Sequence, residues 1–354
     1  MFDVSTHAGD ELRRHSDALA EAIVARQYSR QPKLWEPYGD RGRDIAVRDA
    51  LYHLDMLADA TSVNESALFV DYISWAKVLF HHLGLPDEAL SGTLRCTYEL
   101  IEQSLEPEHA SVLLPIIKEA MDYLPFAPKS VDRFVSEDRP HGQLARRYLD
   151  ELLRGDRTAA GFVIGEALSA GVIVEDIYLH VFQPCQWEIG RLWQMNQVSV
   201  AEEHYCTAAT QLIMSQLYGH IFSTQKGQHR LVSACVGDEM HELGARMVAD
   251  IFELHGWDTH YLGANVPTEA MLSTLDRYSP DVVAISTTLV SHLNRTRELV
   301  ARIRESKHGR TTRIMLGGRP FMTAPGLCSR MGADICEVDA LTALKKAHGI
   351  LGIE

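Results

Sequence analysis

The chain has 354 residues, of which 46% are hydrophobic and 23% are charged, and its formal net charge is −14. This length suggests roughly two to three domains of about 150 residues each, and the composition is that of an ordinary globular protein. The negative charge disfavours nonspecific binding to nucleic acid or to anionic membranes, because both require a basic surface.

The cysteines and the N-terminus both indicate a reducing, aqueous compartment. The 6 cysteines show no CxxC or other metal-binding spacing, and most stand among apolar residues, so we expect buried, reduced thiols. The polar start MFDVSTHAGDELRRHS lacks the apolar segment of a secretory signal. No run of about 18 apolar residues predicts a membrane span. We therefore expect a cytoplasmic protein.

Residues 1–130 are predicted to form an all-helical domain. Apolar residues recur at helical spacing in 10–27, 45–61 and 66–84, and the pattern continues to about residue 127. No alternating strand pattern and no glycine-rich phosphate loop occurs in this part of the sequence. Residues 126–138 combine proline and mixed charge with little periodicity, which predicts a linker.

Two further domains are predicted after the linker. Residues 139–226 contain four segments with helical periodicity, separated by glycines, which predicts a four-helix bundle. From residue 229 to 354, short apolar strands alternate with helices, which favours a mostly parallel, doubly wound sheet in a flavodoxin-like order. The five predicted strands contain HRLVSACV, WDTHYLG, DVVAISTT, TRIMLGG and ADICEV. The predicted fold class is therefore mixed: two all-α domains and one α/β domain.

Small and polar residues follow the predicted strands at their carboxyl ends, where open α/β sheets bind ligands. The segments are GDEMH (237–241), LGAN (262–265), STTLV (286–290) and GGRP (317–320). The first of them is not a GxGxxG fingerprint, so a dinucleotide is not expected. The hydroxyl groups can bind a polar ligand, and the paired glycines allow its close approach to the backbone.

His241 stands where a predicted strand leads into a helix. A histidine there can bind a metal, transfer a proton or cap the helix, and spacing alone leaves these alternatives open. A metal-binding imidazole needs an acceptor for its other ring nitrogen, often a carboxylate, and Asp238 or Glu239 can supply one.

Taken together, these segments resemble the motifs of cobalamin-binding domains. EMHELG at 239–244 resembles the ExHxxG form of the DxHxxG motif, in which many members have aspartate at the first position. STT at 286–288 resembles the SxT or SxL element, and GG at 317–318 resembles the paired-glycine element. LGANVP at 262–267 is also similar to the family.

This resemblance implies a base-off, His-on corrinoid bound at the ends of the strands. His241 would bind cobalt from below, and Glu239 would accept the imidazole proton. The nucleotide tail would be buried along the strand ends, among residues that are small or carry a hydroxyl group: Gly244, Ser286, Thr288, Gly317 and Gly318.

The preceding helical domain resembles the cap over the upper cobalamin face in cobalamin-dependent photoreceptors. There a tryptophan, nine residues and a Glu-His pair follow one another, and Trp193, Glu203 and His204 match this spacing. The resemblance implies that Trp193 packs on the upper group, expected to be 5′-deoxyadenosine, and that Glu203 hydrogen-bonds to it. His204 would bind cobalt after light removes that group. The alternative is a core tryptophan and a helix-capping Glu-His pair.

The order of helical domain, cap and cobalamin domain resembles that of the photocobilins, which carry a bilin-binding helical domain. This resemblance implies biliverdin as a second chromophore, and the alternative is a dimerisation or packing domain. The candidates for holding a bilin are His81, His82, Trp75, Trp35 and Cys96. Direct DNA binding is not expected, because the domain has no basic recognition helix.

The sequence thus predicts a light sensor rather than an enzyme. Photolysis of adenosylcobalamin would change the contacts of the cap, and the protein would change its homo-oligomeric state or its contact with a downstream signalling or enzyme partner. Three alternatives stay open: a corrinoid carrier of a methyltransferase system, a subunit of a cobalamin-dependent isomerase, and a cobalamin-sensing adaptor that does not respond to light.

Overall fold

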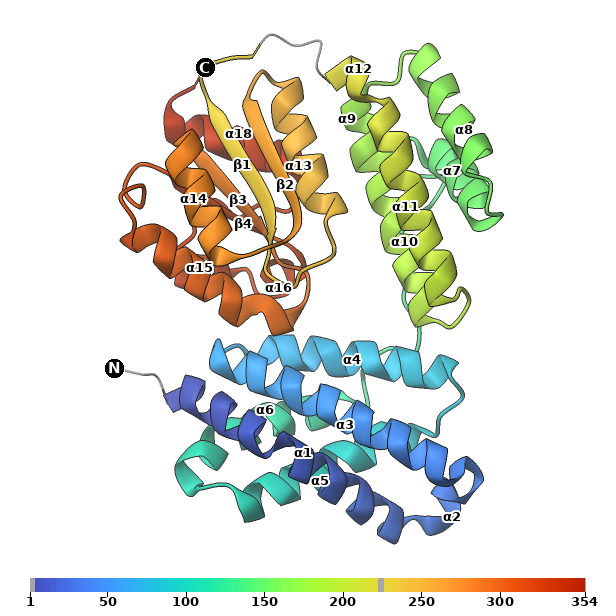
Figure 1. The fold of residues 1–354 in the computed structure, drawn as a ribbon. Coiled ribbons are helices and arrows are strands. Elements are labelled where there is room, and N and C mark those ends of the chain that lie inside the picture. The colour runs from blue at the N-terminus through green and yellow to red at the C-terminus, as the bar shows by residue number, and fades with distance from the viewer. Residues whose placement is uncertain (1–3, 222–225, 354) are drawn as a thin grey trace. The chain divides into compact units, whose positions relative to one another are not determined.

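Two compact units make up the computed structural model, which describes residues 4–221 and 226–353 (Figure 1). The first unit contains Met1–Ser130 and Leu289–Asn294, and the second contains Val131–Thr288 and Arg295–Glu354. Within the described ranges, no helix combines the length and the apolar character that crossing a membrane requires.

The N-terminal unit is helical, as its periodicity predicted. Its long helices are α1 (Val4–Arg30), α3 (Gly39–Ser62), α4 (Ser66–His82), α5 (Asp87–Ser104) and α6 (Pro107–Tyr123). The short helix α2 (Pro32–Trp35) and the 3₁₀ turn η1 (Glu36–Tyr38) connect α1 to α3. Prolines stand at the first positions of α2 and α6, where the missing N–H costs no helical hydrogen bond.

The second unit begins with the predicted helical bundle. Its main helices are α7 (Gly142–Leu153), α8 (Arg157–Ser169), α10 (Gln183–Gln194) and α11 (Val200–Gln216), and short α12 (Tyr218–Ile221) follows them. The predicted third helix is divided, because α9 (Val174–Ile177) passes through the π-helical turn η2 (Tyr178–Phe182) before α10 begins. The bundle was predicted to extend to residue 226, but residues 222–225 lie outside the described ranges.

Local sequence signals explain where these bundle helices begin. The Asp156 side chain accepts a hydrogen bond from the Ala159 N–H at the start of α8. At the start of α11, Ser199 and Glu202 form a reciprocal capping box. The position of α11 matters for the predicted site because Glu203 and His204 lie near its start.

A parallel sheet follows the bundle. Its strands are β1 (Arg230–Val236), β2 (Asp258–Val266), β3 (Val282–Ser286) and β4 (Arg313–Gly317), in the order β2-β1-β3-β4. The longer helices beside it are α13 (Leu243–Leu254), α14 (Thr268–Tyr278), α15 (Leu293–Glu305) and α18 (Ala340–Leu351). Short turns complete the domain: η3 (Val290–His292), α16 (Arg319–Thr323) and α17 (Gly326–Arg330). The mixed fold class is confirmed.

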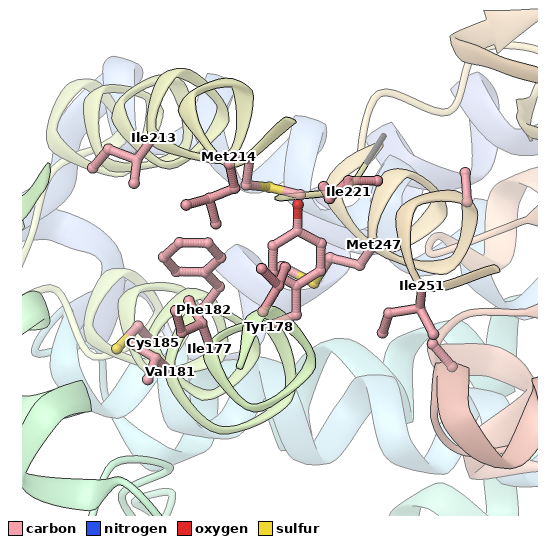
Figure 2. Packing of buried hydrophobic residues seen from close by; sticks show 14 of the residues in the cluster. Ile177, Tyr178, Val181, Phe182, Cys185, Ile213, Met214, Ile221, Met247 and Ile251 are labelled. Atoms are coloured by element: carbon pink, nitrogen blue, oxygen red, sulfur yellow. The ribbon is translucent and has the colours of Figure 1, made fainter. Parts of the chain in front are cut away.

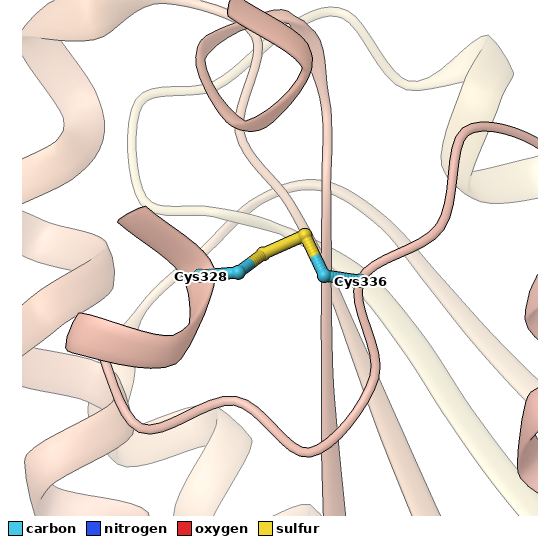
Figure 3. Close-up of a disulfide and its surroundings, with 2 residues drawn as sticks. All are labelled: Cys328 and Cys336. Atoms are coloured by element: carbon cyan, nitrogen blue, oxygen red, sulfur yellow. A yellow bond between two sulfur atoms is a disulfide. The ribbon is translucent and has the colours of Figure 1, made fainter. Parts of the chain in front are cut away.

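The prediction of a fifth strand is wrong. Only an isolated bridge joins Ile335 to Met315 of β4, although Ile335 also exchanges backbone hydrogen bonds with neighbouring residues of that strand. Directly after Ile335, the chain is fixed to α17 by a disulfide between Cys336 and Cys328 (Figure 3). This attachment accounts for the early end of the pairing.

The same disulfide corrects the expectation of reduced thiols throughout. Cys328 and Cys336 are bonded to each other across a sequence separation of 8 residues. The other cysteines are free and buried, as predicted: Cys96, Cys185, Cys206 and Cys235.

The bundle and the sheet domain share one hydrophobic core. Tyr178 and Phe182 from η2 and Met214 from α11 lie in the same buried cluster as Met247 and Ile251 from α13 (Figure 2). Each of these side chains is at most 7% exposed. The cap is therefore packed against α13, the helix that follows the predicted lower-ligand loop.

Candidate functional site

The carboxyl ends of strands β1, β3 and β4 lie in register. Ser286 of β3 pairs with Cys235 of β1 on one side and with Gly317 of β4 on the other. The motif segments that follow these residues therefore start from one edge of the sheet, because the carboxyl ends of parallel strands meet there.

Glu239 organises the loop between β1 and α13. Its side chain is fully buried, and its Oε1 lies 2.5 Å from His241 Nδ1 and accepts the His241 backbone N–H at 3.0 Å. Its Oε2 accepts the backbone N–H of Thr288 at 2.7 Å. One carboxylate thus connects this loop to the end of β3 and fixes the orientation of the imidazole.

The arrangement leaves the other ring nitrogen of His241 available. With Nδ1 donating to Glu239, the neutral ring carries its lone pair on Nε2. The His241 side chain is 58% exposed, whereas its carboxylate partner is 0% exposed. The site therefore presents the Nε2 lone pair of His241 in a fixed orientation, accessible to a metal, with the buried Glu239 carboxylate behind the ring.

The hydrogen bond with Glu239 raises the pKa of His241 above its usual value of 6.5, and burial opposes this shift. The negative charges of Glu239 and, to a smaller extent, Glu203 act in the same direction. Glu203 belongs to α11 of the cap, so the cap carboxylate and His241 lie within electrostatic range of each other.

Asp238, the other predicted orienting carboxylate, has a different role. Its residue adopts a left-handed conformation with φ of 66°, its N–H donates to Asn265 Oδ1 at 2.7 Å, and its carboxylate pairs with Arg295 at 2.7 Å. The Asn265 N–H in turn donates to the Glu239 carbonyl at 2.9 Å. The LGAN segment thus supports the shape of the loop.

The predicted tail-binding glycines have unequal surroundings. Gly318 has φ of +119°, and a methyl group added there would stand 1.8 Å from the Thr287 carbonyl oxygen, so the backbone itself requires glycine. A methyl group on Gly317 or Gly244 would meet no atom within 4 Å. These two positions therefore border open space at the edge of the sheet.

The three residues of the segment 286–288 make different contacts. The Thr287 hydroxyl is buried and hydrogen-bonded to the Thr296 hydroxyl at 2.7 Å, so it stabilises the protein interior. Thr288 contributes its backbone N–H to Glu239. Ser286 is partly buried in the row of strand ends.

The cap triplet spans the turn between α10 and α11. Trp193 is half-buried in the last turn of α10, and Glu203 and His204 lie near the start of α11. Glu203 Oε1 accepts the Thr207 hydroxyl at 3.0 Å, and Glu203 Oε2 lies 3.4 Å from His204 Nε2. The His204 side chain is 73% exposed.

The candidates for bilin binding fall into separate groups. Trp35 stacks on Tyr28 with ring centroids 5.1 Å apart, and the rings of His81 and His82 pack edge to face at 5.2 Å. Cys96 is buried beside Arg30.

The fifth candidate, Trp75, belongs to a group that includes a histidine the sequence did not single out. Trp75 stacks on Tyr72, whose hydroxyl lies 2.9 Å from His53 Nδ1. Burial lowers the pKa of His53 to about 4. His53 lies on the buried face of α3. Helical periodicity predicts a buried position there, but it does not distinguish a ligand-binding histidine from one that packs in the core.

Two B12-binding models match the second unit. Residues 229–346 match the B12 binding domain, and residues 144–218 match a second model of the same description. The chain is therefore a cobalamin-binding protein with a helical B12-binding cap and a Rossmann-like B12-binding domain.

Among curated proteins, the chain is distantly similar to a transcriptional repressor and to a corrinoid protein. The HTH-type transcriptional repressor CarH of Myxococcus xanthus is 24% identical over 239 residues, which cover 67% of this chain and 77% of that protein. Dimethylamine corrinoid protein 1 of Methanosarcina mazei is 24% identical over 121 residues, or 34% of this chain. The chain spans only 55% of that relative's length.

A solved structure has a fold similar to that of more than half of this chain. The Methanosarcina barkeri monomethylamine corrinoid protein superposes with a TM-score of 0.54 at 18% identity, covering 59% of this chain and 99% of that protein. At this identity the likeness concerns the fold alone.

The residues at the strand ends fit a corrinoid. The oriented Nε2 of His241 is the type of donor that a metal takes from a neutral imidazole, and the carboxylate behind it is a common supporting group. The open space beside Gly244 and Gly317 leaves room for a bulky group near the backbone.

Proposed function

We propose that this protein is a cobalamin-dependent light sensor whose cap responds to the group on the upper cobalamin face. Bound adenosylcobalamin supplies a cobalt–carbon bond that light breaks. His241 would hold cobalt through Nε2, with Glu239 accepting its Nδ1 proton. Trp193 and Glu203 contact the adenosyl group from above, and the small residues at the strand ends accommodate the tail.

The observation that carries this proposal is the relation between the cap triplet and His241. Trp193 lies in the last turn of α10, Glu203 and His204 lie near the start of α11, and Gln211 of the same helix donates to Glu242, the residue after His241, at 2.7 Å. The helix that carries Glu203 and His204 is thus joined directly to the loop of His241, which suits it to sense the upper face. The exposed His204 is the cap residue that would hold cobalt once light has removed the upper group, and this change of contact would give the cap two distinct states.

The first test uses absorbance of protein loaded with adenosylcobalamin in the dark. Green light should convert the spectrum once, to a stable bis-histidine form. The His204→Ala variant should bind adenosylcobalamin and undergo photolysis but should not give that form. A spectrum that light leaves unchanged in the wild type would contradict the proposal.

We further propose that the N-terminal unit binds biliverdin. The support for this is the aromatic group around His53, Tyr72 and Trp75, which combines flat rings with a buried imidazole. Protein purified with biliverdin should carry a red-absorbing band that co-elutes with the protein, and Trp75→Ala should lose it. Wild-type protein without such a band would leave this unit as a packing domain.

The similarity to a dimethylamine corrinoid protein favours a second candidate function, a methyl carrier. Such a carrier would accept methylcobalamin, cycle its cobalt between oxidation states and deliver methyl groups to a partner. Methyl transfer that proceeds equally in the dark and in the light, without a change in cap ligation, would favour this candidate over the light sensor.

A further inference from the structure

One face of α13 is a continuous polar strip that binds the cap. Glu242, Arg246 and Asp250 follow one another at four-residue spacing, which places them on the same side of a helix. Each of them makes a hydrogen bond to a side chain or carbonyl of the bundle, and Glu242 is the residue directly after His241.

Glu242 binds the cap and the sheet at the same time. Its Oε1 accepts Gln211 Nε2 of α11 at 2.7 Å. Its Oε2 accepts the Tyr261 hydroxyl of β2 at 2.9 Å and the Ala264 N–H at 3.1 Å. Two groups of β2 thus hold one oxygen of the carboxylate, and its other oxygen binds the cap.

Arg246 continues the same contact one turn further along. Its Nη1 donates to the Gln211 carbonyl at 3.3 Å, and its Nη2 donates to the Ser215 hydroxyl at 3.0 Å and to the Tyr218 hydroxyl at 2.9 Å. The guanidinium also lies over the Tyr218 ring, 5.1 Å from its centroid. The C-terminal half of α11 is therefore fixed to α13.

The same face of α11 carries the upper-face carboxylate. Glu203, Thr207, Gln211 and Ser215 recur every four residues along α11. Glu203 and Thr207 are hydrogen-bonded to each other near the start of the helix, while Gln211 and Ser215 bind α13. A rigid helix thus joins the residue that would contact the upper group to the residue beside His241.

We infer that the Gln211–Glu242 contact is a positioning device that makes the site selective for a cobalamin with a bulky upper group. It sets the distance between the start of α11 and the His241 loop, so that the cap fits the adenosyl group. The inference rests on the proposed function only in taking Trp193 and Glu203 as the contacts to that group. Gln211 and Glu242 act through α11 and touch neither the upper group nor cobalt.

The test compares affinities in the dark for adenosylcobalamin and methylcobalamin, which share the tail and differ in the upper group. Gln211→Leu removes the bond to Glu242 but leaves the Tyr261 and Ala264 bonds of that carboxylate in place. It should weaken adenosylcobalamin binding by about tenfold, the size expected for a hydrogen bond to a charged group, and change methylcobalamin binding much less. Gln216→Leu, the same substitution on an exposed part of α11, is the matched control and should change neither.

A double-mutant cycle with Glu242→Ala, which deletes the acceptor of the bond, tests the contact itself. If the two side chains act together, Gln211→Leu should cost no further adenosyl selectivity once Glu242→Ala is present. Equal losses for both cobalamins, or an unchanged ratio, in a Gln211→Leu protein that keeps its melting temperature would overturn the inference. Wild-type protein that binds both cobalamins but ignores light would instead refute the light sensor and leave the positioning role intact.

Discussion

At the scale of single residues, the His241 site depends on one buried carboxylate. Glu239 supports the imidazole on Oε1 and the end of β3 on Oε2, so its charge is fully used by donors from two parts of the chain. The sequence left Asp238 and Glu239 as alternatives for this role. Only the fold distinguishes them, because Asp238 turns away in a left-handed conformation towards Arg295.

The pKa of His241 tests this support without any cofactor. In the apo wild type, proton NMR should give a pKa above 6.5, because the Glu239 bond outweighs burial. The contribution of this pair to stability is then complete below about pH 6.5 and is lost as pH rises through the raised folded-state value. In Glu239→Gln, burial is less opposed and the pKa should fall below that of the wild type. An unchanged value would contradict the assigned bond.

Substitution by alanine should affect stability at Gly318 and cobalamin binding at Gly317. Gly318→Ala should destabilise the apo protein by about 1–3 kcal/mol or more, because its positive φ and the nearby Thr287 carbonyl both exclude a side chain. Gly317→Ala should leave apo stability nearly unchanged and weaken cobalamin binding, because its methyl group enters open space. Denaturant unfolding and cobalamin titration of both variants measure the difference. Equal stability of the two variants would contradict these surroundings.

At the scale of secondary-structure elements, the attachment of η2 to α13 is the contact that sequence patterns predict least. The Tyr178 hydroxyl donates to Asp250 Oδ2 at 2.8 Å, and both side chains are buried. Burial raises the pKa of Asp250 from 3.8 to about 6. The carboxyl group is therefore ionised in the folded protein only above about pH 6.

Tyr178→Phe should cost more at high pH than at low pH. The pKa of Asp250 is raised in the folded state, so protonation of this carboxyl group stabilises the fold fully below about pH 4. This contribution is lost as pH rises through about 6. Above that range the bond serves a buried charge, so its loss should cost about 1–3 kcal/mol, and less at pH 4.5. Urea unfolding of the variant and the wild type at pH 4.5 and pH 8 measures both values. Equal penalties at the two pH values would contradict this account.

The disulfide at the edge of the sheet should stabilise the oxidised protein. It closes a loop between residues separated by 8 positions, and loops of this size contribute about 2–3 kcal/mol by restricting the unfolded chain. Dithiothreitol should lower the stability of the wild type by that amount. The Cys328→Ser/Cys336→Ser variant should already be less stable and should not respond to the reductant. A wild type that is equally stable with and without dithiothreitol would show that the bond does not form.

Helix periodicity and strand alternation were sufficient to predict the order of elements, because apolar spacing is a local property. The end of β4 pairing at Ile335 was not predictable, because it depends on a contact between Cys336 and Cys328 through space. The π-helical turn at Tyr178–Phe182 was also missed, because its apolar residues fit an unbroken helix equally well. The motif positions followed from sequence, whereas the Glu242–Gln211 contact required the packed structure.

At the scale of the whole molecule, the two units carry different kinds of evidence. The second unit combines B12-binding matches, an oriented histidine and a cap carboxylate that acts on it. The N-terminal unit contributes aromatic groups and the buried His53. The proposed light response therefore belongs to the second unit, and biliverdin would extend its range of wavelengths.

The most direct measurement of the central claim is size-exclusion chromatography with light scattering on protein loaded with adenosylcobalamin, before and after green light. A switch in the cap predicts a different assembly in the two states, and His204→Ala should separate photolysis from the stable lit assembly. If the wild-type protein has the same elution volume and mass in the dark and after complete photolysis, a light-controlled change of assembly is contradicted.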